Sequence, residues 1–330
     1  MPHPHGKIKV DYKLLKVIIE LPYVTKGLSI RQGGFNHKKQ NYQMNTPRRL
    51  ILLFSLIFSL FCTTALWGQQ REQTTISQKS QKWKLGVSLY TFSNVSFPEQ
   101  LMYADSCGLK YIEGFVFAKA GTALKDSFIV QLSPKAISML KQEIDKKKLS
   151  MESIYIIGGK KVTDWKRDFE IAKNFGVKYV TAEPPRNLWD SVDSLAHIYG
   201  IKVALHNHWK ETSIYWHPDS VLVALKGHPN FWACPDLGHY PKSGIDPIDA
   251  IKKLKGRILG VHLKDINEYN NNKIQDVALG TGVINFPLFF TELKKQKFKG
   301  YLIIERDTKE QPSNLQSVKK AIKYIHEQTR

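Results

Sequence analysis

Acidic and imidazole side chains follow several apolar, strand-like stretches of this sequence. Asp236 directly follows one such stretch at 231–235, His262 lies within a second, and Glu305 follows a third. Carboxylates and imidazoles are the side chains that bind divalent cations and that move protons at neutral pH. The sequence therefore predicts a metal-dependent or acid-base site where strands end.

Side-chain alternation indicates which of these groups face the same way. Side chains on a strand point to opposite faces with a period of two, so His262 and Lys264 share one face while their apolar neighbours form the other. The same reasoning, applied to the other strands, points these polar residues inward: Glu183, His206, His208, Asp236 and Glu305. Each of them alone also has a structural interpretation, and His262 alone would more often be a core histidine, but four strands ending alike favour a site.

We predict one divalent cation bound by a residue from each of four strands: Glu183, Asp236, His262 and Glu305. Oxygen-rich ligation favours Mn²⁺, with Mg²⁺ and Co²⁺ also compatible, and the imidazole also allows Zn²⁺. His206 is an alternative to Glu183 as the fourth ligand.

The elements that must position these residues alternate regularly from residue 83 onward. We expect strands at 84–90, 110–115, 149–157, 178–183, 201–206, 231–235, 258–263 and 300–304, each followed by a helix. Eight strand-helix units in residues 83–330 match the typical ~250 residues of an eight-stranded parallel barrel. An open doubly wound sheet would usually carry a Gly-rich phosphate loop after an early strand, and none is present. The predicted fold is a single (β/α)8 TIM barrel, with its active site at the C-terminal ends of the strands.

The N-terminal region differs in composition from this barrel. Arg48 and Arg49 precede an apolar stretch at 50–66, which predicts an export signal over 44–69 that starts at Met44. Residues 1–43 are then an over-long start or leader, and 70–82 form a linker. A transmembrane anchor is the alternative, because 17 apolar-type residues approach the length of a span, roughly 18 to 20 residues. We expect a periplasmic or secreted protein with no membrane span after cleavage.

Charge and cysteine content exclude some partners. The formal net charge is +20, but residues 1–82 hold 13 Lys and Arg against 3 Asp and Glu, so about half of the excess lies outside the predicted barrel. No basic block interleaved with aromatics follows, which argues against nucleic acid as a partner. Cys107 and Cys234 are the two cysteines of the barrel, and we expect both to serve packing rather than a disulfide framework.

From residue 83 to the end, the chain resembles the xylose-isomerase-like barrel superfamily of sugar isomerases and epimerases. The resemblance lies in Pro235-Asp-Leu-Gly-His239, Val261-His-Leu-Lys-Asp265, the loop 279–286 and Ile303-Ile-Glu305. It implies one divalent metal and the isomerisation, epimerisation or dehydration of keto-sugars. It also implies that Asp236, His262 and Glu305 are ligands and that His239 contacts substrate or an extra metal.

The sequence departs from the resembling epimerases on the fifth strand. These enzymes typically place a glutamate there as ligand and base, whereas this chain has His206-Asn207-His208. Either Glu183 on the fourth strand or His206 would then complete the metal site. The superfamily also contains a multi-zinc nuclease, but that branch needs further histidines on the early strands, and residues 83–196 contain none.

Roles follow for the remaining polar and aromatic residues. The predicted catalytic residues are Glu183, Glu305, His208 and Lys264. The predicted substrate-binding residues are His206, Asn207, His239, Glu113, Tyr90 and Trp209. Aromatics near strand ends could also stack on sugar rings, namely Phe92, Phe115, Phe117 and Tyr240.

The function predicted from the sequence is an exported, divalent-metal-dependent sugar isomerase or epimerase that abstracts a proton next to the carbonyl of a keto-sugar. One alternative is a dehydratase or lyase that expels a β-substituent from a 3-keto-glycoside or a keto-polyol. A barrel that binds carbohydrate without catalysis is another. The small-molecule partner is therefore a sugar or glycoside, and the oligomeric state is left open.

Overall fold

The structure, a computed structural model, describes residues 83–310 and 313–329. The leader, signal peptide and linker predicted over 1–82 lie outside the described residues. Among the described residues, no helix combines the length and the apolar content that crossing a membrane requires.

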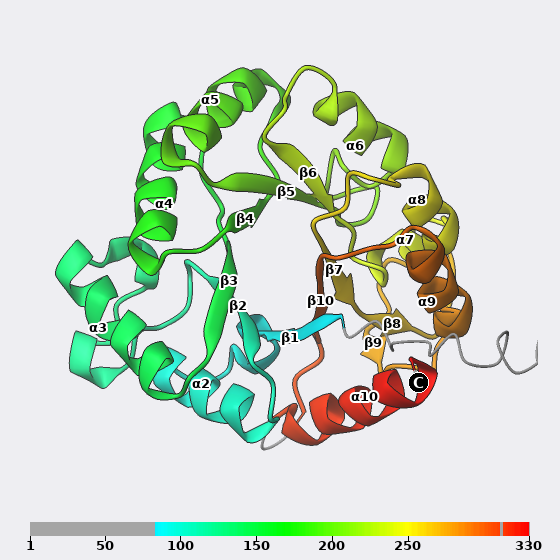
Figure 1. Cartoon of the computed structure of the whole chain (residues 1–330), viewed down its shortest axis with the longest axis horizontal. Helices are drawn as coiled ribbons and strands as arrows, with labels where there is room; N and C mark the ends of the chain where they lie inside the picture. The colour runs from blue at the N-terminus through cyan, green and yellow to red at the C-terminus, as the bar shows by residue number, and fades with distance from the viewer. Residues whose placement is uncertain (1–82, 311–312, 330) are drawn as a thin grey trace, which may run out of the picture. The chain divides into compact units, whose positions relative to one another are not determined.

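Eight parallel strands form the centre of the fold, and helices surround them as a ring (Figure 1). The strands are β1 (Lys84–Ser88), β2 (Tyr111–Phe115), β3 (Ser150–Tyr155), β4 (Tyr179–Ala182), β5 (Lys202–His206), β6 (Phe231–Cys234), β7 (Gly260–Leu263) and β10 (Tyr301–Ile304). Their order in the sheet is β6-β5-β4-β3-β2-β1-β10-β7. The predicted (β/α)8 barrel is confirmed.

The sheet closes on itself between β6 and β7. Two isolated parallel bridges join these strands, Ala233 with Ile258 and Asp236 with His262. The amide of His262 donates to the carbonyl of Pro235 at 2.9 Å. This closure holds Asp236 directly beside His262, so the barrel itself brings two predicted metal ligands together.

The helices that follow the strands begin where the sequence offers caps. They are α2 (Phe97–Ser106), α3 (Pro134–Lys146), α4 (Val162–Phe175), α5 (Trp189–Tyr199), α6 (Pro218–Leu225), α8 (Pro247–Lys253), α9 (Phe286–Lys295) and α10 (Leu315–Gln328). Ser96 and Glu99 form a capping box at α2, and the Ser133 side chain accepts a hydrogen bond at the start of α3. Such caps satisfy amides that have no partner within the helix.

The barrel interior below the site is filled by side chains. Tyr179, Ala204, Cys234, Tyr301 and Ile303 form a buried cluster there. Cys234 is a free thiol within this packing, and Cys107 is a free, half-buried thiol. A filled interior leaves the C-terminal ends of the strands as the place for ligands, as in other barrels of this kind.

The structure adds elements that the sequence pattern did not indicate. A short helix, α7 (His239–Lys242), follows β6, and a two-stranded hairpin, β8 (Asp265–Ile266) with β9 (Asp276–Val277), follows β7. The buried carboxylate of Asp265 accepts hydrogen bonds from the amides of Gly280 and Gly282 at 2.9 Å each. The glycine loop after the seventh strand is therefore a tight turn anchored on Asp265.

Candidate metal centre

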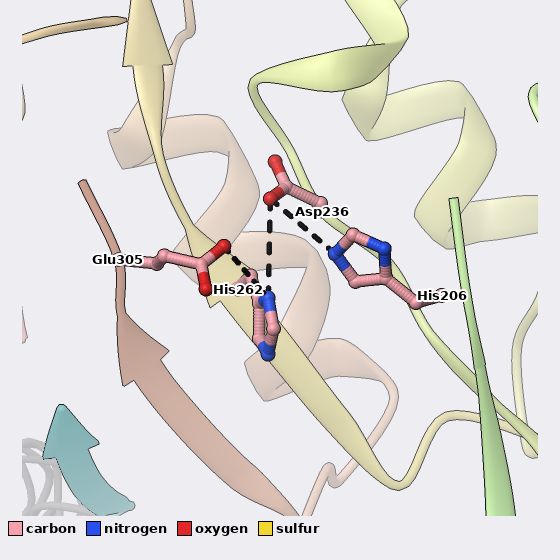
Figure 2. Close-up of side chains that lie close together, drawn as sticks. All are labelled: His206, Asp236, His262 and Glu305. Atoms are coloured by element: carbon pink, nitrogen blue, oxygen red, sulfur yellow. Dashed lines mark hydrogen bonds and ion pairs between the residues drawn. The ribbon is translucent and has the colours of Figure 1, made fainter. Parts of the chain in front are cut away.

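Four buried side chains converge at the C-terminal ends of neighbouring strands. They are His206, Asp236, His262 and Glu305, and each offers a ligand atom within 4.8 Å of the others. Figure 2 shows them pointing toward one another from β5, the end of β6, β7 and the end of β10. Three of the four residues were predicted as ligands, and the fourth, His206, is the alternative to Glu183. Glu183 belongs to a second group of possible ligands, with His206 and His208.

Close polar contacts in this group indicate what it would bind. His206 Nε2 is buried without a hydrogen-bond partner among the described residues, and Asp236 Oδ2 is buried and pairs with Lys264 Nζ at 2.9 Å. His206 Nε2 and Asp236 Oδ2 lie 3.6 Å apart, and His262 Nδ1 lies 3.9 Å from the same Asp236 oxygen. Buried polar atoms normally have partners, so an open imidazole nitrogen beside the carboxylate of Asp236 fits a metal cation.

Each imidazole of the group is held from behind by a carboxylate. His206 Nδ1 lies 3.1 Å from Glu183 Oε1, while Nε2 faces Asp236. His262 Nε2 lies 2.8 Å from Glu113 Oε1, while Nδ1 faces Glu305 at 3.1 Å. A carboxylate behind a metal-binding histidine fixes the ring orientation and the tautomer. Both histidines therefore present a fixed nitrogen to the centre.

Glu113 is buried beneath the site and does not line its cavity. Its Oε2 accepts hydrogen bonds from Ser153 Oγ at 2.7 Å and Thr181 Oγ1 at 2.6 Å. These contacts correct the expectation that Glu113 contacts substrate. Glu113 lies in the middle of β2, below the side chains that line the cavity. Its position suits it to orient His262.

Glu183 lies outside the four-residue group and outside the cavity lining. Its carboxylate contacts His206, His208, Ser213 and Tyr155. Burial disfavours the charged carboxylate, but hydrogen bonds with His206 and His208 hold the pKa of Glu183 well below its ordinary value. Glu183 therefore remains an anion that aligns two imidazoles.

Lys264 is the cation of the site, and it is 2% exposed. Its Nζ lies 2.9 Å from Asp236 Oδ2, 3.1 Å from Glu305 Oε2 and 2.9 Å from Asp307 Oδ2. Burial alone would lower the pKa of this ammonium, but the three carboxylates raise it well above its ordinary value. Lys264 is thus charged and is a proton donor rather than a base.

A cavity of about 490 Å³ opens above these residues. His206, His208, His239, Lys264, Glu305 and Asp307 contribute its polar wall. Tyr90 and Trp209 line it as predicted, together with Phe115, Phe117 and Tyr155. The other two aromatics proposed for stacking, Phe92 and Tyr240, are fully buried in the protein.

Asn207 has a structural contact instead of the predicted contact with substrate. Its side-chain amide donates to the carbonyl of Asp236, and its oxygen accepts from the amide of Asp236 at 2.8 Å. It therefore ties β5 to the turn that carries Asp236. The sequence reasoning missed Tyr155 and Asp307, although each lies at or just beyond the end of a predicted strand.

Glu113→Gln and Glu183→Gln are each expected to weaken metal binding by about 10- to 100-fold, because each removes the anion behind a ligating histidine. Metal titration of the purified protein measures this effect. Glu143→Gln is the control, since Glu143 pairs with Lys146 on the surface of α3. If Glu113→Gln and Glu183→Gln both bound metal as tightly as Glu143→Gln does, the orienting role of the two glutamates would be contradicted.

Metal binding is also expected to weaken as the pH falls. Burial disfavours protonation of His206, but the neighbouring carboxylates of Asp236 and Glu183 outweigh it and raise the pKa to about 9 in the metal-free protein. A ligating imidazole must be neutral, so below that pH a proton must leave before metal binds. Between pH 8 and 6 the apparent Kd should rise about 100-fold or more, which is roughly tenfold per pH unit for each proton displaced. A Kd that stays constant over this range would contradict the displacement of a proton from His206 when the metal binds.

Comparison with known proteins identifies similar chains. A family model described as xylose isomerase-like TIM barrel matches residues 101–328. The inosose dehydratase of Mesomycoplasma hyopneumoniae (strain J) is 31% identical over 144 residues, which cover 38% of this chain and 48% of that protein. The chain thus matches about half the length of this curated relative.

Two solved structures extend the comparison over the whole barrel. An uncharacterized protein from Parabacteroides distasonis has a TM-score of 0.60 and 31% identity, and the match covers 74% of this chain and 98% of that one. The IOLI protein, solved with a zinc atom, has a TM-score of 0.64 and 19% identity over 74% of this chain and 98% of that one. The second likeness concerns the fold alone.

Proposed function

The chain belongs to the xylose isomerase-like TIM barrel family, and from this membership and its site we propose that it is a divalent-metal-dependent dehydratase. The reaction would remove water, or another β-substituent, from a keto-polyol or keto-sugar. The proposal is supported by the partial similarity to an inosose dehydratase and by the donor groups around the cavity.

The single observation that carries the proposal is the presence of the His208 imidazole and the Lys264 ammonium together in the cavity wall. His208 Nδ1 contacts Glu183, which leaves Nε2 as the nitrogen available to substrate. A carboxylate that fixes a histidine in this way prepares the opposite nitrogen as a general base.

These two groups can carry the two proton transfers of an elimination. His208 Nε2 would take the proton next to the carbonyl, the electron pair of that C–H bond would form a C=C bond, and the C–O bond of the β-substituent would break. Lys264 Nζ would donate its proton to the departing oxygen, so a β-hydroxyl leaves as water. A divalent cation held by His206, Asp236, His262 and Glu305 supplies a Lewis acid for the carbonyl oxygen.

Epimerisation with inversion asks for different groups, because a base is needed on each face of the same carbon for the two directions of the reaction. The carboxylates here are already engaged: Glu305 contacts His262 and Lys264, and Glu183 is turned toward histidines. Lys264 is paired with three carboxylates and starts as an ammonium, so it is placed to give a proton rather than to take one. This geometry favours elimination over the isomerase or epimerase reaction expected from the sequence.

The test uses metal-loaded protein, inosose and other keto-sugars in D₂O, with product masses as the readout. The proposal expects a product that lacks the mass of one water, or of the β-substituent, formed only when metal is present. A product that has lost no water or other group, and is heavier only by the deuterium next to its carbonyl, would indicate epimerisation or isomerisation instead. His208→Gln should abolish formation of the eliminated product without removing the metal.

The types of ligand also influence which metal ion binds most tightly. Two imidazoles and two carboxylates are less oxygen-rich than the predicted set, which shifts the preference from Mn²⁺ toward Zn²⁺ or Co²⁺. We propose that Zn²⁺ and Mn²⁺ both bind and that Zn²⁺ binds more tightly. Competition between the two ions, followed by metal analysis, tests this order.

We also propose that the protein is exported, since the basic pair and apolar stretch at 48–66 match a signal sequence. The mature chain would then begin near Gln69 or Gln70. Mass spectrometry of the N-terminus measures this, and an intact cytoplasmic chain starting at Met1 would contradict it.

A further inference from the structure

A second hollow adjoins the proposed catalytic cavity, and the two share the aromatic side chains Tyr90, Phe115 and Phe117. We propose that this second hollow is a subsite for a further ring of the substrate, so that the enzyme acts on keto-rings carrying a sugar or aromatic substituent rather than on single rings. This inference rests on the proposed elimination at the metal centre and adds the substrate class to it.

Volume is the first argument. The catalytic cavity measures about 490 Å³, and the adjoining hollow measures about 580 Å³. Each alone falls in the range of roughly 300–1,000 Å³ that buries a drug-sized ligand. A single keto-ring with its hydroxyls fits within the first cavity, so the second is space that a single-ring substrate does not use.

Side-chain chemistry at the junction is the second argument. The rings of Phe115 and Phe117 lie 4.7 Å apart, and Tyr90 packs edge-on against both, at 5.6 and 6.0 Å. Farther out, Phe128 also lines the second hollow, and it is 42% exposed. Aromatic surfaces of this kind bind the apolar face of a ring and leave its hydroxyls at the edge.

Polar groups at the rim of the second hollow are unengaged. Asn94, Lys119 and Asp126 line it, and their side chains make no hydrogen bond or ion pair within the part of the chain that the structure describes. By contrast, Glu99 at the same rim is already bonded to Ser96. Ring hydroxyls in the hollow would therefore find free donors and acceptors beside an aromatic floor, the usual composition of a ligand pocket.

The wall of the second hollow is a built part of the fold. It is formed by residues of 90–99, after β1, and of segment 116–133, which joins β2 to α3 and contains two short 3-10 helices. The segment is hydrogen-bonded to itself, from Val130 N to Val116 O at 2.7 Å and from Ile129 N to Ala118 O at 3.0 Å. Lys119 and Phe128 form an antiparallel bridge. A long loop fixed in this way after a barrel strand is a usual place for substrate contacts.

Binding of unoxidised sugars to the full-length, metal-loaded protein tests the subsite independently of turnover. Phenyl β-glucoside should bind more tightly than glucose, and Phe128→Ala should weaken binding of the phenyl glucoside by roughly two- to tenfold, as expected for loss of one aromatic contact. Phe117→Leu, which keeps an apolar side chain without the ring, should do the same. The control is Leu288→Ala, because Leu288 is also a large, exposed apolar residue but lies on α9.

The same variants are then compared in turnover of inosose and of a phenyl 3-keto-glucoside. The ratio of kcat/KM for the two-ring to the one-ring substrate should exceed one in the wild type and should fall in Phe128→Ala. If both substrates were eliminated with equal kcat/KM, and neither variant changed these values, the subsite proposal would be wrong. The dehydratase proposal would remain supported. A binding preference for the phenyl glucoside without any elimination would support the subsite and contradict the dehydratase.

Discussion

Asp236→Asn is expected to release the metal and to lower kcat/KM by more than about 100-fold. Mutating a residue that only supports a metal ligand costs up to about 100-fold, and Asp236 is itself a proposed ligand. Asp236 is fully buried, and its Oδ2 faces His206, His262 and Lys264. Asparagine keeps the shape and removes the charge. If the amide nitrogen took the place of Oδ2, its N–H donors would face the ammonium of Lys264, which is also a donor.

Metal analysis and steady-state rates on the same preparation measure this effect. Asp249→Asn is the matched control, because Asp249 is exposed on α8 and pairs only with Lys252. Thermal unfolding confirms that the variant is folded. An Asp236→Asn protein that retains stoichiometric metal and wild-type rates would show that the centre lies elsewhere.

Lys264→Met is expected to destabilise the metal-free protein by about 3–5 kcal/mol, the usual cost of removing one partner from a buried ion pair. The substitution leaves the carboxylates of Asp236, Glu305 and Asp307 facing each other without their ammonium. A bound divalent cation would screen that repulsion, so metal should restore part of the stability. It should not restore activity, because the proton donor is absent.

Urea unfolding with and without added metal, together with the product assay, separates these two effects. Lys253→Met serves as the control, since Lys253 forms only an exposed pair with Asp219. Lys264→Arg is not expected to rescue activity. The Lys264 stem packs so closely on Gly238 that a Cβ there would lie 2.6 Å from Lys264 Cγ, which leaves little room for a wider side chain. Full activity of Lys264→Met with metal present would rule out Lys264 as the acid.

Much of this site could be predicted from the sequence because strand geometry controls it. Side chains at the ends of β6, β7 and β10 follow the alternation of a parallel barrel, so the residue pattern alone is enough to place Asp236, His262 and Glu305 together. The barrel itself followed from the repeated strand-helix pattern. Within such elements, local sequence and tertiary arrangement agree.

The errors in the prediction arise where strand geometry stops. Strand β4 ends at Ala182, so Glu183 lies in the following loop, and alternation no longer fixes its direction. Two prolines follow it, and the carboxylate turns sideways to His206 and His208. Glu113 does face inward as expected, but alternation does not indicate how deep in the barrel a side chain lies. The second hollow depends on a loop whose conformation no periodicity describes.

The most direct test of the proposed metal centre is anomalous diffraction from crystals of the metal-loaded protein. One cation is predicted within about 2.0–2.3 Å of His206 Nε2, Asp236 Oδ2, His262 Nδ1 and a Glu305 oxygen, with Glu183 hydrogen-bonded behind His206. A cation coordinated by Glu183 in place of His206, or one bound away from these four residues, would contradict it.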